Sequence, residues 1–199
     1  IIKHLYNTFK DTIDFNKQNN NGDTVFMLAM HYRKADYYLH YILKDQAQLD
    51  INLNNKNGDT SLIFAIRTNS YILIPYLCKQ FKDTIDINIQ YNDGNTALML
   101  AIQESYIGDA KDLCKTFKDK LDINIRNNDG DTALMFAIRH GRNATIVKYF
   151  CEMFKDKLDI NVKDNNGYTA LMLAIRCGIK AEVIQYLCDA LLNIEKKKK

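Results

Sequence analysis

The sequence is poor in the residues that break regular structure. Its 199 residues include one proline, eight glycines and no tryptophan, and no stretch approaches the ~18–20 consecutive apolar residues of a membrane-spanning helix. These scarcities exclude a collagen-like or low-complexity chain and argue against a β-rich fold with many tight turns. Because 47% of the residues are hydrophobic, a disordered chain is excluded as well. A globular domain or a repeat array remains.

The sequence also has little excess of either charge, with 27 Lys and Arg residues against 24 Asp and Glu residues. The formal net charge at pH 7 is +3, and the run Lys196–Lys199 supplies four positive charges, so the remainder of the chain carries −1. A nucleic-acid-binding domain usually shows a basic bias over one face. The sequence therefore argues against a nucleic-acid partner.

The cysteines recur at a fixed interval and form no CxxC pair. Intervals of 36, 37 and 37 residues separate Cys78, Cys114, Cys151 and Cys188. A free cysteine behaves as a small buried hydrophobe, so this spacing indicates a repeated core position rather than a metal site. Unpaired thiols fit a reducing, intracellular and cytoplasmic compartment.

Glycines mark the same repeat. They recur every 36 or 37 residues at Gly22, Gly58, Gly94, Gly130 and Gly167. The surrounding segments read alike, as in DINIQYNDGNTALMLAI and DINIRNNDGDTALMFAI. Asp-Ile-Asn predicts a short extended run, and the Asn/Asp-rich residues with the glycine predict a turn.

Two helices are predicted after each turn. A threonine two residues beyond the glycine is placed to cap the first helix, at Thr24, Thr60, Thr96, Thr132 and Thr169. An alanine of constant size predicts close helix packing, at Ala29, Ala65, Ala101, Ala137 and Ala174. A second helix follows from apolar stripes such as Ala110, Leu113, Cys114 and Phe117. Pro75 falls inside one second helix and should kink it or delay its start.

These copies resemble ankyrin repeats. The core Gly-x-Thr-Ala-Leu-Met-x-Ala-Ile is similar to the family's Gly-x-Thr-Pro-Leu-His-x-Ala-Ala, and VKYFC at 147–151 is similar to its Ile-Val-Lys-Leu-Leu-Leu. The resemblance implies an all-α repeat fold, an α-solenoid of helix-turn-helix units joined by β-hairpin-like loops. Tetratricopeptide repeats have a nearby period but lack the hairpin. The extra residues relative to the family period carry Phe-Lys-Asp, and we expect them to add half a turn to the second helix.

The register sets the expected organisation. Five repeats are expected at about 14–49, 50–85, 86–121, 122–158 and 159–192, with the second half of a truncated repeat at 1–13 and a basic tail at 193–199. The first residues match the end of a repeat. We therefore expect the chain to be a segment of a longer protein.

No catalytic signature is present. GxSxG, HExxH, GxGxxG and P-loop motifs are missing, and the four histidines share no repeat position. The Asn-Asp-Gly turns superficially resemble a calcium loop, but that register puts Ile125 at the first ligand position, where an apolar residue cannot coordinate calcium. We expect no enzyme activity, no cofactor, no metal and no small-molecule substrate.

A protein-binding surface is expected where the repeats vary. In a stacked array the packing positions must repeat, whereas solvent-facing positions are free to differ. By resemblance, ankyrin proteins contact their partners with hairpin tips and the concave face of the first helices. The candidate residues are Tyr32, Asp59, Arg67, Gln103, Glu104, Asp131, Arg139, His140, Tyr168 and Arg176.

The arginines among them allow two interpretations. Arg67, Arg139 and Arg176 share one register, which fits either a basic floor for a partner or solvated helix ends that complement the helix dipole. Tyr32 and Tyr168 are stronger candidate anchors, because aromatic residues dominate interface energetics. The leading hypothesis is a scaffold that binds another protein. The alternative is a targeting or inhibitory arm of a larger enzyme, such as a ubiquitin ligase adaptor, with catalysis outside this segment.

Overall fold

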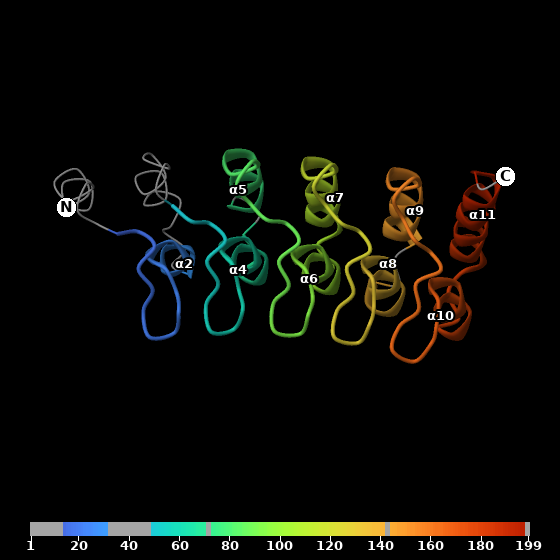
Figure 1. Ribbon diagram of the computed structural model, residues 1–199, viewed down its shortest axis with the longest axis horizontal. Coiled ribbons are helices and arrows are strands. Elements are labelled where there is room, and N and C mark those ends of the chain that lie inside the picture. The colour runs from blue at the N-terminus through green and yellow to red at the C-terminus, as the bar shows by residue number, and fades with distance from the viewer. Residues whose placement is uncertain (1–13, 32–48, 71–72, 142–143, 198–199) are drawn as a thin grey trace. The chain divides into compact units, whose positions relative to one another are not determined.

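The chain is described by a computed structural model, which places residues 14–31, 49–70, 73–141 and 144–197 (Figure 1). It divides into two compact units, unit 1 at Ile1–Asp86 and unit 2 at Ile87–Lys199. The expected partial repeat at 1–13 and the candidate anchor Tyr32 lie outside the described residues.

Each unit is built from hairpin loops and paired helices. The described helices of unit 1 are α2 (Val25–His31), α4 (Ser61–Arg67) and α5 (Leu73–Gln80). Here α2 and α4 are inner helices, which follow a hairpin, and α5 is an outer helix. In this unit α4 packs against both α2 and α5.

Unit 2 repeats the arrangement over three copies. Its helices are α6 (Ala97–Gln103), α7 (Ile107–Thr116), α8 (Ala133–Phe136), η2 (Ala137–Gly141), α9 (Ala144–Met153), α10 (Ala170–Arg176) and α11 (Ala181–Lys197). In Figure 1 the inner helices α6, α8 and α10 lie side by side in one row, and the outer helices α7, α9 and α11 lie in a second row. The inner helix formed by α8 ends in the π-helical segment η2. The expected all-α repeat fold is confirmed.

The predicted threonine caps are present. The hydroxyl of Thr96 accepts a hydrogen bond from the Met99 N–H, and Thr60 and Thr132 make the same contact with the residue three positions on, all at 3.4 Å. The cap residues have extended φ and ψ values. Each hydroxyl satisfies one of the N–H groups that the first helical turn leaves without a partner.

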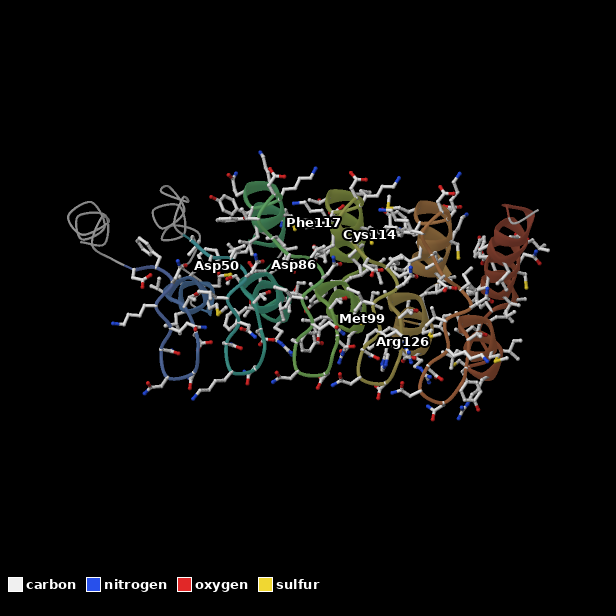
Figure 2. The ribbon with its side chains drawn as sticks, viewed as in Figure 1. Asp50, Asp86, Met99, Cys114, Phe117 and Arg126 are labelled. Carbon is white, nitrogen blue, oxygen red and sulfur yellow. The ribbon has the colours of Figure 1, made fainter. Side chains whose placement is uncertain are left out.

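Four of the five constant alanines are buried in the inner helices, and Ala29 is half-buried. Ala65, Ala101, Ala137 and Ala174 are fully buried. Around them the apolar stripes of the outer helices form the core, with Cys114 and Phe117 labelled on and just after α7 in Figure 2. Burial raises the pKa of the Cys114 thiol to about 12, so it stays protonated and behaves as a packing residue.

The Phe-Lys-Asp segment does not extend the outer helix, contrary to expectation. The outer helix α7 ends at Thr116, and Phe117–Lys120 form a turn. The Leu121 N–H donates to the Phe117 carbonyl at 2.7 Å and closes this turn. Phe117 is buried, so it holds the turn against the core. Pro75 lies in the first turn of α5, where its missing N–H is tolerated.

The hairpin loops contain no strand among the described residues. Isolated bridges join Gln18 to Thr24 and Gln90 to Thr96. Successive loops are joined instead by the side chain of the asparagine in Asp-Ile-Asn. The Asn88 Oδ1 accepts a hydrogen bond from the Asp122 N–H, and the Asn88 side-chain amide donates to the Lys120 carbonyl, both at 2.9 Å. At Gly94 an added Cβ would lie 2.6 Å from the Asn128 nitrogen, so neighbouring loops approach too closely for a side chain there.

Candidate functional site

Inner-helix ends are tied to the hairpin loop that precedes them. The Arg67 Nε lies 2.8 Å from an Asp59 carboxylate oxygen eight residues earlier. Asp59 is 3% exposed, whereas the Arg67 side chain is 41% exposed. The sequence suggested that Asp59 is exposed at a hairpin tip, but it is buried and cannot contact a partner there. It holds the Arg67 guanidinium in place instead.

Arg139 makes the same contact and one more. Its Nε lies 2.8 Å from an oxygen of Asp131, which is 2% exposed, and its terminal nitrogen pairs with the buried Asp164 carboxylate of the next loop. Burial raises the pKa of Asp131, and the Arg139 guanidinium offsets part of that rise. One cation thus joins two loops and one helix end.

The third arginine has a different partner. In the copy containing Gly167, Tyr168 stands where two other copies have Asp59 and Asp131. The Arg176 guanidinium carbon lies 4.8 Å from the centre of the Tyr168 ring. This geometry is a cation–π contact. Arg176 is exposed and Tyr168 is half-buried, so both reach the surface.

The remaining candidates lie at the same end of the inner helices. Gln103 is the last residue of α6, Glu104 follows it, and both are exposed. His140 is exposed in η2, with its ring stacked on Phe136 at 4.3 Å between ring centres. Unit 2 therefore brings seven of the candidates to the ends of its inner helices or to the loop residue before them. Arg67 and Arg139 are held by buried carboxylates, and their role in binding a partner stays a prediction.

Sequence reasoning missed Asp164. Its Oδ1 accepts hydrogen bonds from the N–H groups of Asn166 and Tyr168, and Asn55 and Asn127 make the same turn contact in other loops. The Asp164 Oδ2 forms the ion pair with Arg139. A sequence signal existed: the copy that follows Arg139 carries Asp at a position that is Asn in those two copies.

The described parts of the chain hold neither a metal-binding cluster nor a membrane-spanning helix. Within these residues no group of three or more His, Cys, Asp or Glu side chains is placed to hold a metal ion. None of the helices described is both long and apolar enough to cross a membrane.

The chain belongs to the ankyrin repeat family. The family model described as ankyrin repeats (3 copies) matches residues 1–90, 35–121 and 105–199. No curated protein matches the sequence. Ankyrin repeats generally mediate protein–protein interaction, and their domains are typically non-catalytic scaffolds.

Solved structures with the same fold include three that align along most of this chain. A chain in the structure of a predatory endopeptidase from Bdellovibrio bacteriovorus in complex with an immunity protein is 27% identical, with 94% of this chain and 90% of that chain covered and a TM-score of 0.66. The ankyrin repeat protein EF0377 is 25% identical, with 94% and 91% covered and a TM-score of 0.73. An ankyrin repeat domain from Acinetobacter baumannii AYE is 20% identical, with 95% and 92% covered and a TM-score of 0.76, and that likeness concerns the fold alone.

Proposed function

We propose that the chain is a scaffold that binds a partner protein through the ends of its inner helices and the adjoining hairpin residues. The observation that carries the proposal is the cation–π pair of Tyr168 and Arg176, which reaches the surface. It occupies the position where Asp59–Arg67 and Asp131–Arg139 form ion pairs with a buried carboxylate. An aromatic ring there adds nothing that the fold needs in the other copies.

The chemistry of this surface suits a protein partner. Tyrosine and arginine are enriched among the residues that dominate interface energetics. The guanidiniums of Arg139 and Arg176 are held in place before binding, which lowers the entropy lost when a partner docks. Gln103 and Glu104 add amide and carboxylate groups at the neighbouring helix end. A partner segment with carboxylates or backbone carbonyls beside an apolar side chain would match this set.

Asp59 and Asp131 take a different role within the proposal. Both are buried, so they act through Arg67 and Arg139 and do not touch the partner. The contacting set in unit 2 is Gln103, Glu104, Arg139, His140, Tyr168 and Arg176, and Arg67 is its counterpart in unit 1. Tyr32 stays in the proposal on its sequence register alone.

Affinity capture with cross-linking tests the proposal. The bait is the full chain, compared with a Tyr168→Ala/Arg176→Ala variant and with Lys115→Ala as a control on the outer helix α7. Lys115 is 60% exposed and forms a surface ion pair with Asp112, so its loss should be neutral. We expect the same partner with the wild type and the control, and at least tenfold weaker recovery with the double variant. Equal recovery by all three would reject this surface.

A second candidate is that the chain restrains or targets an enzyme. It rests on the 27% identity to a chain in the structure of a predatory endopeptidase in complex with an immunity protein. A captured partner with hydrolase activity that falls on adding the chain would favour it, and unchanged activity would oppose it.

The location proposed for the scaffold is the cytoplasm. All five cysteines are free thiols, and burial raises the pKa of Cys151 to about 11, so this thiol is held protonated. Such thiols fit a reducing compartment.

A further inference from the structure

Three of the hairpin turns contain an asparagine that is followed directly by the turn glycine. These asparagines are Asn21, Asn57 and Asn166, whereas Asp93 and Asp129 hold the same position in the other two copies. All three asparagines are exposed, and their side-chain amides make no hydrogen bond within the described residues. The proposed binding surface does not use these side chains, so their chemistry is separate from it.

An asparagine side chain before glycine is open to attack by the next backbone nitrogen. At Asn57 the Gly58 nitrogen forms a bond to Cγ, the Cγ–Nδ2 bond breaks, and the amide proton of Gly58 leaves with the departing ammonia. Water then opens the cyclic imide and gives aspartate or isoaspartate. Glycine favours the attack because it has no Cβ to shield its nitrogen.

The folded turn holds the attacking nitrogen away from the side chain. The Gly58 N–H donates to the Asn55 carbonyl at 2.9 Å, and the Gly22 N–H donates to the Asn19 carbonyl at 2.9 Å. Before the attack, the glycine nitrogen must leave this hydrogen bond and its peptide plane must rotate. Because the attack is intramolecular, its rate depends on how often the turn opens and not on solvent exposure of the glycine.

The turn at Asn21 is braced by two further contacts. The Gln18 side-chain amide donates to the Gly22 carbonyl at 2.6 Å and to the Asn54 carbonyl at 2.8 Å. The Lys56 N–H donates to the Asn21 carbonyl at 2.9 Å, which fixes the peptide bond between Asn21 and Gly22. Opening this turn therefore requires breaking more than the turn hydrogen bond.

The turn at Asn57 lacks the side-chain brace. Asn54 stands four residues before Gly58, as Gln18 stands before Gly22. Its side chain is one methylene shorter than that of glutamine, and within unit 1 it donates no hydrogen bond to the Gly58 carbonyl. In unit 2 long side chains make the brace, from Gln90 to Gly94 and from Arg126 to Gly130. A short residue at position 54 thus leaves the turn at Asn57 easier to open.

We propose that Asn57 is a modification site, at which the chain converts asparagine to aspartate and isoaspartate with water as the only co-reactant. Gln18 protects Asn21 from the same reaction. The inference rests on the turn contacts of unit 1 and does not depend on a partner protein.

The two products affect the hairpin differently. Asp93 and Asp129 hold the equivalent position in unit 2, and both turns keep the hydrogen bond of the glycine N–H. The aspartate product therefore fits the turn and adds one negative charge. Isoaspartate routes the main chain through Cγ and lengthens it by one carbon, so the Gly58 N–H is displaced from the Asn55 carbonyl. Conversion to isoaspartate opens the hairpin tip.

Peptide mapping of the full chain during storage in slightly alkaline buffer tests the proposal. Chromatography with mass spectrometry separates the asparagine, aspartate and isoaspartate forms of each peptide. Asn92 is exposed in a hairpin of unit 2 and is followed by aspartate, so it is the internal control. Asn54→Gln supplies the brace at Asn57, and Gln18→Asn removes it at Asn21. Circular dichroism checks that both variants remain folded, and the same chains in urea report the reaction without the turn.

The expected size of the effect follows from one hydrogen bond. A hydrogen bond of ordinary net strength changes an opening equilibrium by about 2- to 12-fold. In the folded chain Asn57 should convert at least about twofold faster than Asn21, and in urea the two rates should be similar. Asn54→Gln should slow conversion at Asn57, and Gln18→Asn should speed conversion at Asn21.

Three results would overturn the proposal. The first is conversion at Asn57 that does not exceed the level at Asn92. The second is a ratio of the Asn57 rate to the Asn21 rate that is the same in the folded chain and in urea. The third is a conversion rate that Asn54→Gln and Gln18→Asn both leave unchanged.

Discussion

The Arg139 Nε lies 2.8 Å from a carboxylate oxygen of Asp131, eight residues earlier in the chain. The same guanidinium also pairs with Asp164, which belongs to the following hairpin loop. Both carboxylates are buried, so one arginine neutralises charge in two loops at once. Arg67 makes the simpler version of the contact, with Asp59.

Removing Arg139 should cost more stability than removing Arg67. Arg139→Ala leaves two buried carboxylates without their cation, and we expect a loss of about 3–5 kcal/mol in the free energy of unfolding. Arg67→Ala takes the cation from the buried Asp59, but the Arg67 guanidinium is more exposed than that of Arg139, so its cost should be smaller. Urea unfolding of both variants measures the order. Equal losses would show that Asp164 does not depend on Arg139.

The charge on Asp131 should make stability depend on pH. Burial raises the pKa of Asp131 in the folded chain, and repulsion from Asp164 adds to this. A carboxyl whose folded pKa exceeds its unfolded pKa binds more protons when folded, so its contribution to stability improves as the pH falls through the folded value. Asp131→Asn removes that contribution. We expect the difference in unfolding free energy, wild type minus Asp131→Asn, to increase as the pH is lowered from neutral into the acid range. A falling difference would contradict the raised pKa.

Much of the fold follows from the sequence because its determinants are local. Thr96 lies next to the helix that it caps, and Ala101 recurs in a register that the turn glycines define. The Arg139–Asp131 pair could not be predicted in the same way, because Asp131 lies in the loop before α8 and Arg139 lies in η2 at the far end of that inner helix. The sequence suggested that Asp131 was exposed, since it varies between copies. In the structure Asp131 is buried, and the Arg139 guanidinium pairs with it.

The turn between the two helices should gain stability from glycine. Ser105 has a φ of +62°, the value that Gly178 adopts at the same position of another copy. A non-glycine residue in this region is strained, so Ser105→Gly should raise the unfolding free energy by about 0.5–1 kcal/mol. Gly178→Ser is the reciprocal variant. An added Cβ at Gly178 meets no atom within 4 Å, so any stability lost in Gly178→Ser would come from backbone strain alone. Thermal unfolding that leaves both variants unchanged would contradict this reasoning.

The constant alanine should not tolerate a larger side chain. Ala101 is fully buried in α6, and Ala101→Leu should destabilise unit 2 by about 1–3 kcal/mol through overpacking. Gln103→Leu, on the same helix but exposed, should change stability by less than about 0.5 kcal/mol. Denaturant unfolding compares them. A neutral Ala101→Leu would mean that the inner helices are not closely packed at this point.

The binding surface proposed for unit 2 could be narrowed by sequence but not defined by it. The register placed Gln103, Arg139 and Arg176 at equivalent helix ends. The register alone did not predict that Arg176 stacks on Tyr168 while Arg139 is held by carboxylates. The partner of each arginine is set by the residue eight positions earlier, whose side-chain direction the sequence does not give.

Binding at the ends of the inner helices is tested most directly by NMR mapping with the captured partner. Backbone amide shifts of the full chain are recorded with increasing partner. The predicted result is that the largest shift changes fall at Gln103, His140, Tyr168 and Arg176, with little change along the outer helices α7 and α9. Shift changes concentrated on α7 and α9, with the inner-helix ends unaffected, would contradict the proposed binding surface.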